Sequence, residues 1–376
     1  MVSVVYANEG ISVYDELFLS HLSRKFDVIF ISFNPHPKHV PDDVRVILMP
    51  EPLRRLPAQH NIRLYSMSAL RGFILRKFVN VLRPNVLIGC WALEYGFYSA
   101  LAGFKPFILI IWGSDVVVAP KRFFIFRFMA QFALRKADAV ILDSEVQRDA
   151  VINLGCDPRK ILKFPWFDSE GVKVNRSRLE VRRELGWIDN PIVICLRRHE
   201  PIYGVQNFVE AIPHIVKALP RTRFLIIGQG QLTGKLKHVV KELGVQNYVL
   251  FLGHVSHEAT TTYLNAADVN VSMSLSDGTS ASLLEAMSLG VPSIVTAIPG
   301  NMEWIKDGWN GHLVPIGDSR QLAGKVILLL KDEKLREQVK EKALETVRAK
   351  ANWSTSLESL NGLIFRLVKE KHAFGS

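Results

Sequence analysis

Short apolar runs rich in β-branched residues alternate along this chain with longer segments of helical periodicity. Parallel strands need long crossover connections, which are usually helices, so this alternation predicts a parallel sheet covered by helices on both faces. The first series of expected strands lies at 2–6, 27–33, 44–49, 86–89, 107–112, 139–142 and 161–164. Helices are expected between them, near 12–24, 60–82, 92–103, 121–136 and 145–153.

A second series of the same kind follows the turn-forming stretch 165–171. With 376 residues, of which 48% are apolar, the chain has enough core material for two domains. We therefore predict an α/β protein with two doubly wound Rossmann-like domains, 1–168 and 169–352, facing a central cleft. The expected strands of the second domain are 192–196, 224–228, 249–252, 269–272, 293–296 and 312–314.

The cysteines and the N-terminal residues indicate in which cellular compartment the protein is expected. Three widely spaced cysteines, Cys90, Cys156 and Cys195, provide neither a disulfide framework nor a zinc cluster. The first residues lack a basic leader and look like a strand, and no apolar run approaches the ~20 residues that span a bilayer. We expect a cytoplasmic protein.

The formal net charge of +11 calls for a partner or a surface. Residues 51–84 contain seven bases and one acid, and residues 121–136 place five aromatic and five basic residues in one predicted helix. This segment suits the interface of an anionic membrane, but its phenylalanines could equally pack a core while the bases are solvated. Phosphates of an acceptor or of nucleic acid are further candidates for the bases. No nucleic-acid recognition module is present, so nucleic acid is not expected as a partner.

The stretch 274–292 contains two acids, Asp277 and Glu285, separated by seven residues. Small polar residues fill the gap and an apolar run follows, which predicts a turn that enters a helix. The free N–H groups and positive dipole end of such a helix attract phosphate. Glu285, one turn deeper, can accept hydrogen bonds from two neighbouring hydroxyls such as those of a ribose. The residues expected around the donor diphosphate here are Gly278, Thr279, Ser280, Ala281, Ser282 and Leu283.

Two adjacent arginines, Arg197 and Arg198, follow the expected strand 192–196 and precede a helix. Arginine grips phosphate oxygens with a planar fork and keeps its charge, so this position favours a phosphate contact over an exposed salt bridge. Gly228 and Gly230 end the next strand, where glycine lets the backbone approach a ligand closely, although packing alone also produces such turns. His254 and His257 follow another strand, but a metal site needs a third ligand that the sequence does not offer.

These segments resemble the retaining GT-B glycosyltransferases called family 4. The stretch from Asp277 to Glu285 is similar to the family's E-x7-E signature, with Asp for the first Glu. The segment around Arg198 resembles G-R-L-x-x-x-K-G, with Tyr203 in place of Lys, and residues 109–115 resemble T-x-H-G-x-D, with Trp112 in place of His. Asp115 matches that motif, and Gly10 matches one of two glycines that the family carries after its first strand.

The resemblance implies a transferase that uses a nucleotide-diphosphate sugar. It implies that Arg198 and Arg197 neutralise the diphosphate, that Asp277 holds donor-sugar hydroxyls, and that Tyr203, Gly10 and His254 line the donor site. Trp112 and Asp115 are expected at the acceptor side, where Asp115 either binds a sugar hydroxyl or caps the following turn. The last helix, within 353–376, is expected to complete the first domain. No Asp-x-Asp occurs in the chain, so we expect no metal and no other cofactor.

Three hypotheses follow for the function. The first is a retaining, metal-independent glycosyltransferase that serves a sugar acceptor or a lipid-linked, membrane-proximal one, placed peripherally on the inner face of a membrane. The second is a GT-B nucleotide-sugar epimerase, which shares the donor but needs no acceptor. The third is a basic nucleic-acid-binding protein, which only the positive net charge supports.

Overall fold

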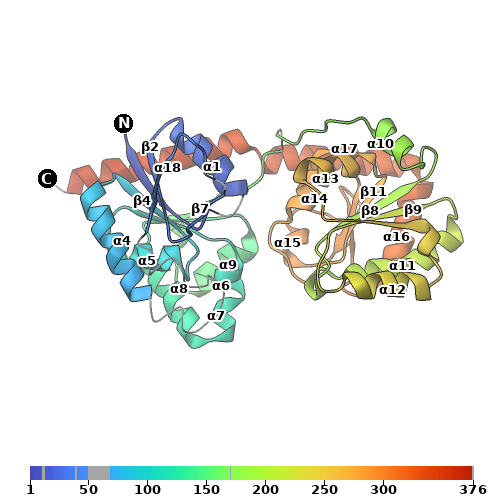
Figure 1. Cartoon of the computed structure of the whole chain (residues 1–376), viewed down its shortest axis with the longest axis horizontal. Helices are drawn as coiled ribbons and strands as arrows, with labels where there is room; N and C mark the ends of the chain where they lie inside the picture. Colours follow the sequence, from blue (N-terminus) through green and yellow to red (C-terminus); the bar gives the residue numbers. More distant parts are fainter. Residues whose placement is uncertain (11–12, 39, 50–67, 170, 375–376) are drawn as a thin grey trace. The chain divides into compact units, whose positions relative to one another are not determined.

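The computed structural model describes residues 1–10, 13–38, 40–49, 68–169 and 171–374. The chain divides into two compact units, one formed by Met1–Trp166 with Ser354–Ser376 and the other by Phe167–Trp353. Each unit is a twisted sheet with helices on both faces (Figure 1). All thirteen strands expected from the sequence are present, and every pairing between them is parallel.

The first unit contains a seven-stranded sheet in the order β3-β2-β1-β4-β5-β6-β7. The strands β1, β4, β5 and β6 are almost wholly buried, as expected for strands that helices cover on both sides. Chain order reverses between β1 and β4, which makes their carboxyl ends the switch point of this sheet. The strands are β1 Ser3–Ala7, β2 Asp27–Ser32, β3 Arg45–Leu48, β4 Val86–Cys90, β5 Phe107–Ile110, β6 Ala139–Leu142 and β7 Ile161–Lys163.

Where the structure describes them, the helices of the first unit follow the predicted pattern with one correction and one addition, the short helix α6; residues 60–67 of the helix expected at 60–82 lie outside the described residues. The segment 121–136, expected as a single helix, forms two helices because Phe123 adopts an extended conformation between them. Apolar periodicity could not indicate this break, since phenylalanine stands on both sides of it. The helices are α1 Val13–Ser23, α4 Ser68–Leu82, α5 Tyr95–Ala102, α6 Ser114–Val117, α7 Ala119–Arg122, α8 Phe124–Lys136 and α9 Glu145–Asn153.

The second unit repeats the architecture with six strands in the order β10-β9-β8-β11-β12-β13. Its switch point lies between β8 and β11, and its core packs the buried faces of these strands against α11 and α16. The strands are β8 Ile192–Leu196, β9 Arg223–Ile227, β10 Val249–Gly253, β11 Val269–Ser272, β12 Ser293–Thr296 and β13 His312–Val314. The helices are α10 Arg178–Glu184, α11 Val205–Ala218, α12 Thr233–Glu242, α13 His257–Ala266, α14 Ala281–Ser288, α15 Pro299–Met302, α16 Ser319–Lys331 and α17 Glu333–Lys350.

The last helix, α18 (Trp353–Phe374), packs on the first unit. The Asn361 amide lies 3.2 Å from His21 Nε2, and the ring of Phe365 lies 5.4 Å from that of Phe26. The cysteines Cys90, Cys156 and Cys195 are free and buried, so the expectation that they form no disulfide holds. Across the described ranges, no helix combines the length and apolarity that a membrane crossing requires.

Candidate functional site

The carboxyl ends of β8 and β11 carry the polar side chains that the sequence singled out in the second unit. The loop after β8 contains Arg197 and Arg198, and the loop after β11 leads through Asp277 into α14. These loops diverge at the switch point, which is where ligands of doubly wound sheets bind.

Arg197 lies at the centre of this cluster. Its Nε donates a 2.8 Å hydrogen bond to Ser272 Oγ, and its Nη2 donates one of 2.5 Å to Ser280 Oγ. The same Nη2 lies 2.7 Å from a carboxylate oxygen of Asp277, and the side chain is only 10% exposed. The guanidinium also lies 5.4 Å from the centre of the Tyr203 ring, within the range of a cation–π contact. Arg197 therefore joins the end of β8, the end of β11 and the start of α14.

The start of α14 is capped as its sequence predicts. Ser280 is the N-cap, and its hydroxyl accepts a hydrogen bond from the Leu283 N–H. The Ser282 hydroxyl lies 3.3 Å from that of Ser280, and the Leu283 side chain is buried in the core. The side chain of Leu283 therefore packs the helix onto the unit, while Gly278, Thr279, Ala281 and Ser282 remain partly accessible around the helix start.

Glu285 lies one turn into α14 and is buried, with 8% of its side chain exposed. Burial raises the pKa of this carboxyl to about 7, although the positive charge of Arg197 opposes the shift. Its Oε1 lies 3.5 Å from Nδ1 of His257, the first residue of α13, whose side chain is 73% exposed. His257 therefore contacts the carboxylate that the sequence assigned to a ribose.

Arg198 has a different environment from its neighbour. Its side chain is 73% exposed and lies 4.0 Å from Glu200 Oε1. That same oxygen accepts a 3.3 Å hydrogen bond from the Gln231 N–H, so the loop after β8 packs against the loop after β9. The Arg198 guanidinium is largely exposed, and among the described residues only Glu200 lies within ion-pair distance of it.

Three glycines lie so close to the backbone of a neighbouring loop that no side chain fits there. Gly228 has φ +133°, and a Cβ there would lie 2.1 Å from the Arg197 carbonyl oxygen. A Cβ on Gly230 would lie 2.7 Å from the His199 carbonyl oxygen, and one on Gly204 would lie 2.1 Å from that of Met273. Larger residues would push apart the loops that hold Arg197 and Arg198.

Three residues of this region carried no assigned role in the sequence analysis. Ser272 binds Arg197 and could have been found as the polar last residue of a buried strand. His199 is fully buried, with Nδ1 2.8 Å from Thr233 Oγ1, and it anchors the loop after β8 on α12. For His257 the sequence had favoured a role beside a nucleotide base or at the surface over that of a metal ligand. His254 is exposed after β10, and no group of three or more His, Cys, Asp and Glu suited to a metal occurs within the described residues.

In the first unit, Asp115 is buried and bonded to the backbone. Its two carboxylate oxygens accept 2.8 Å hydrogen bonds from the Ala92 and Gly113 N–H groups. Burial raises its pKa to about 6, and these hydrogen bonds limit the shift. Both oxygens therefore join the loops after β4 and β5 and do not cap the turn that follows Asp115.

Trp112 and Gly10 lie near the carboxyl ends of the same sheet. Trp112 stacks between Trp91 and Trp166, with ring centres 6.3 and 5.1 Å away. Gly10 has φ +72°, and a Cβ there would lie 2.8 Å from Pro37, so packing alone accounts for this glycine. Its neighbours Ile11 and Ser12, and the bases Arg54, Arg55 and Arg63 of the basic stretch, lie outside the described residues.

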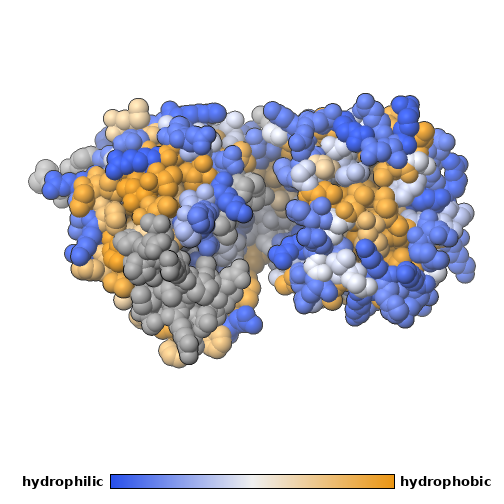
Figure 2. Space-filling view, in the orientation of Figure 1, coloured by the Kyte–Doolittle hydropathy of each residue, from blue (hydrophilic) through white to orange (hydrophobic). Residues whose placement is uncertain are grey.

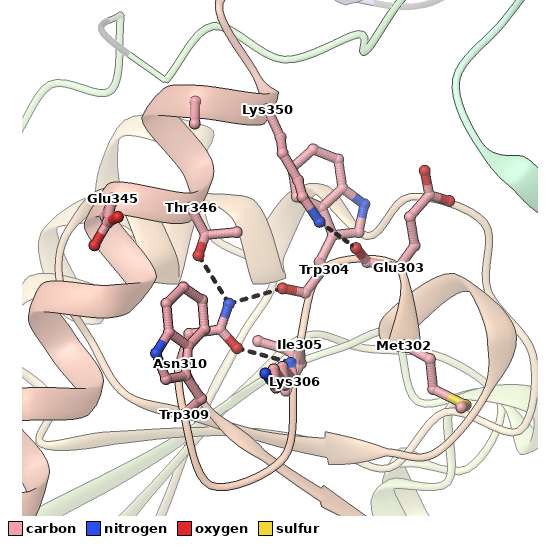
Figure 3. Close-up of a pocket in the computed structure, with 11 residues that line it drawn as sticks. Met302, Glu303, Trp304, Ile305, Lys306, Trp309, Asn310, Glu345, Thr346 and Lys350 are labelled. Carbon is pink, nitrogen blue, oxygen red and sulfur yellow. Dashed lines mark hydrogen bonds between the residues drawn. The ribbon is translucent and has the colours of Figure 1, made fainter.

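A separate cavity of about 310 Å³ opens between the loop after α15 and the end of α17 (Figure 3). Asn310 organises its wall, because its amide nitrogen donates to the Trp304 carbonyl and to Thr346 Oγ1 while its oxygen accepts from the Lys306 N–H. None of the residues assigned to the donor lines this cavity, so it is not part of the candidate site.

Comparisons with known families and structures agree with this architecture. Residues 177–346 match the family described as glycosyl transferases group 1, and residues 6–144 match the family described as glycosyl transferase 4-like. The solved structure of Anabaena HepE in complex with UDP superposes with a TM-score of 0.78 at 18% identity, over 98% of this chain and 100% of that one. The same protein with UDP-glucose gives a TM-score of 0.76 at 19% identity and the same coverage.

Among relatives by sequence, the N-acetyl-alpha-D-glucosaminyl L-malate synthase of Bacillus anthracis is 32% identical over 220 residues. That match takes in 58% of this chain and 57% of the relative, so the chain spans little more than half of that protein's length. Its two Rossmann-like units and its likeness to these structures place the chain in the GT-B class of α/β proteins. Within that class, the chain belongs to the group 1, family 4-type glycosyltransferases.

Proposed function

We propose that this protein is a retaining glycosyltransferase that moves a sugar from a nucleotide-diphosphate sugar to a hydroxyl group of an acceptor. The observation that carries the proposal is the switch-point cluster of the second unit, where Arg197, Asp277 and Ser280 meet at the start of α14. The structures of HepE with UDP and UDP-glucose support a nucleotide sugar as the donor class.

The cluster offers complementary groups for each part of such a donor. Partly accessible residues around the start of α14 can direct N–H groups at the diphosphate. Glu285 can accept both ribose hydroxyls once it is ionised, and His257 stands beside it to contact the same ribose. Asp277 lies before the helix, where its second oxygen can accept from a hydroxyl of the donor sugar.

The two arginines take different parts in this proposal. Arg197 already donates to Ser272 and Ser280 and pairs with Asp277, so it orients the helix start and the acid. Arg198 is exposed and has free donors, so it is the residue that binds the diphosphate. As the glycosidic bond breaks, negative charge grows on the diphosphate and Arg198 stabilises it together with the N–H groups of α14.

We propose that the reaction needs no metal ion, because Arg198 and the start of α14 supply the positive charge on the leaving group. Activity should persist in excess chelator. A loss of turnover that added Mg²⁺ restores would overturn this part of the proposal.

A thermal-shift panel with UDP-, GDP- and ADP-sugars tests the proposal, since a ligand that binds the folded state raises the melting temperature. We expect one nucleotide class to stabilise the wild-type protein, and Arg198→Ala to lose most of that shift. Arg183→Ala, which changes another exposed arginine of the same unit, on α10, is the control and should keep it. If no nucleotide sugar raises the melting temperature, the proposal fails.

A further inference from the structure

An apolar and basic stripe covers the outer face of α8. Phe124 and Phe128 are 86% and 58% exposed, and Arg127 and Arg135 are exposed at helical spacing on the same side. The opposite side of the helix packs Phe126, Met129, Ala130, Ala133 and Leu134 into the core. Packing into the core therefore accounts for only one side of this helix and leaves Phe124 and Phe128 in solvent.

The helix α4 carries a similar stripe. Leu70, Phe73 and Val81 are exposed at helical spacing, and the Lys77 Nζ lies 4.8 Å from the centre of the Phe73 ring. Both α4 and α8 pack against α5, which lies between them and is almost wholly buried. Their outer sides therefore belong to one helical layer of the first unit, which we call the α4–α8 face.

The α4–α8 face carries one sign of charge. Residues 68–83 and 116–136 contain no acid at all, and no ion pair within the described parts of the chain engages their exposed bases. Apolar and hydrophilic surface lie next to each other at the outer edge of this unit, where Figure 1 places α4 (Figure 2). The exposed bases are Arg76, Lys77, Arg83, Lys121, Arg122, Arg127, Arg135 and Lys136.

We infer that the α4–α8 face docks the protein peripherally on an anionic lipid surface. Lysine and arginine attract acidic headgroups, while phenylalanines inserted between them remove apolar area from water at the depth of the headgroup boundary. The charge complementarity and the exposed phenylalanines point to the same occupant. The inference does not depend on the donor site, because it uses other residues of another unit.

Nucleic acid is the competing partner for a basic surface with aromatic residues, since bases stack on aromatic rings. Nucleic acid is the poorer match, because the surface also exposes aliphatic side chains that have no ring on which a base could stack. These are Leu70, Val81 and Val118. An acyl-chain boundary accepts them as readily as it accepts phenylalanine.

Co-sedimentation of the full chain with vesicles tests the inference. The vesicles contain phosphatidylcholine alone, or phosphatidylcholine with about one third phosphatidylglycerol to create a negative surface potential. We expect binding to the anionic vesicles only, and weaker binding as salt shortens the Debye length from about 10 Å to about 4 Å.

Two double variants separate the contributions. Arg122→Gln with Arg127→Gln should weaken binding roughly 25-fold, at about fivefold for each base near the surface. Phe124→Ser with Phe128→Ser should weaken it at least about tenfold. Leu179→Ser with Arg183→Gln, which changes an exposed apolar and an exposed basic residue of α10, should leave it unchanged.

All variants change exposed residues, so their melting temperatures should match the wild type, as should their thermal shift with a nucleotide sugar. Absence of binding to anionic vesicles overturns the inference, as does an equal loss in the α10 control. Vesicle binding that ignores both phenylalanines, with steeply salt-dependent binding of a single-stranded oligonucleotide, would assign the face to nucleic acid instead.

Discussion

The two sheets of this protein share a doubly wound strand order and differ in the surroundings of the acids that follow their strands. In the second unit the polar groups remain partly accessible, and Asp277 faces a guanidinium and the start of a helix. In the first unit Asp115 is enclosed and both its oxygens accept from backbone N–H groups. An acid beyond a strand end is thus partly accessible in one unit and enclosed by backbone hydrogen bonds in the other.

This difference teaches that a strand-end acid acquires its role from the groups around it. A carboxylate whose oxygens are taken up by backbone N–H groups stabilises the fold, while a partly accessible one at the start of a helix can bind a substrate. Mutations around the two acids should therefore separate into effects on activity and effects on stability.

The largest expected effect is on catalysis in the second unit. Arg198→Ala should lower kcat about 10²–10³-fold, the usual loss when one donor to a developing negative charge is removed. Its melting temperature should stay near that of the wild type, because the side chain is 73% exposed. Steady-state kinetics with the stabilising nucleotide sugar measures this, and wild-type turnover would remove Arg198 from the mechanism.

The counterpart in the first unit should affect stability. Asp115→Ala leaves one buried and one partly buried N–H group without this acceptor and should lower the free energy of unfolding by about 3 kcal/mol. Asp149→Ala, at an exposed position of α9, should change it by less than about 0.5 kcal/mol. Urea denaturation compares the two. An unchanged midpoint for Asp115→Ala would show that its enclosure is not structural.

Two glycines with positive φ sharpen the comparison. Replacing Gly228 or Gly113 by alanine forces an L-residue into a strained conformation, which costs roughly 1–3 kcal/mol. Only Gly228→Ala also drives a Cβ against the Arg197 backbone, whereas the nearest atom at Gly113 is the Gln147 side-chain amide nitrogen, 3.2 Å away. We expect Gly228→Ala to be the less stable variant by urea denaturation and to bind nucleotide more weakly. Equal destabilisation would argue against the close contact.

The smallest expected effect is a pH dependence. Because burial raises the pKa of Glu285 to about 7, the folded protein keeps a proton between about pH 4.5 and 7 that the unfolded chain has released. The free energy of unfolding should therefore lose a contribution as pH rises through this window, and Glu285→Gln should lack that component.

Nucleotide binding should respond in the opposite sense. If the ribose needs the ionised carboxylate, affinity should fall by up to about tenfold per pH unit below 7, where Glu285 is protonated in the free protein. Glu285→Gln should bind about tenfold more weakly at pH 8 and show a flat profile by calorimetry. A wild-type affinity in this variant would remove Glu285 from the ribose.

The sequence predicted the strands well because buried parallel strands are continuous apolar runs that local composition reveals. It also located the polar loops, since these follow the strand ends. It could not decide which of Arg197 and Arg198 turns inward, because both follow the same strand and differ only in their tertiary partners. The stack of Trp91, Trp112 and Trp166 was out of reach for a similar reason, since these residues lie on three separate loops.

The central claim is that the second unit binds the diphosphate of a nucleotide sugar at the start of α14. A crystal structure with the nucleotide sugar that gives the largest thermal shift tests it most directly. We predict the diphosphate within hydrogen-bond distance of Arg198 and of N–H groups in 278–282, with the ribose on Glu285. A nucleotide bound away from the segment 277–285 would contradict the account.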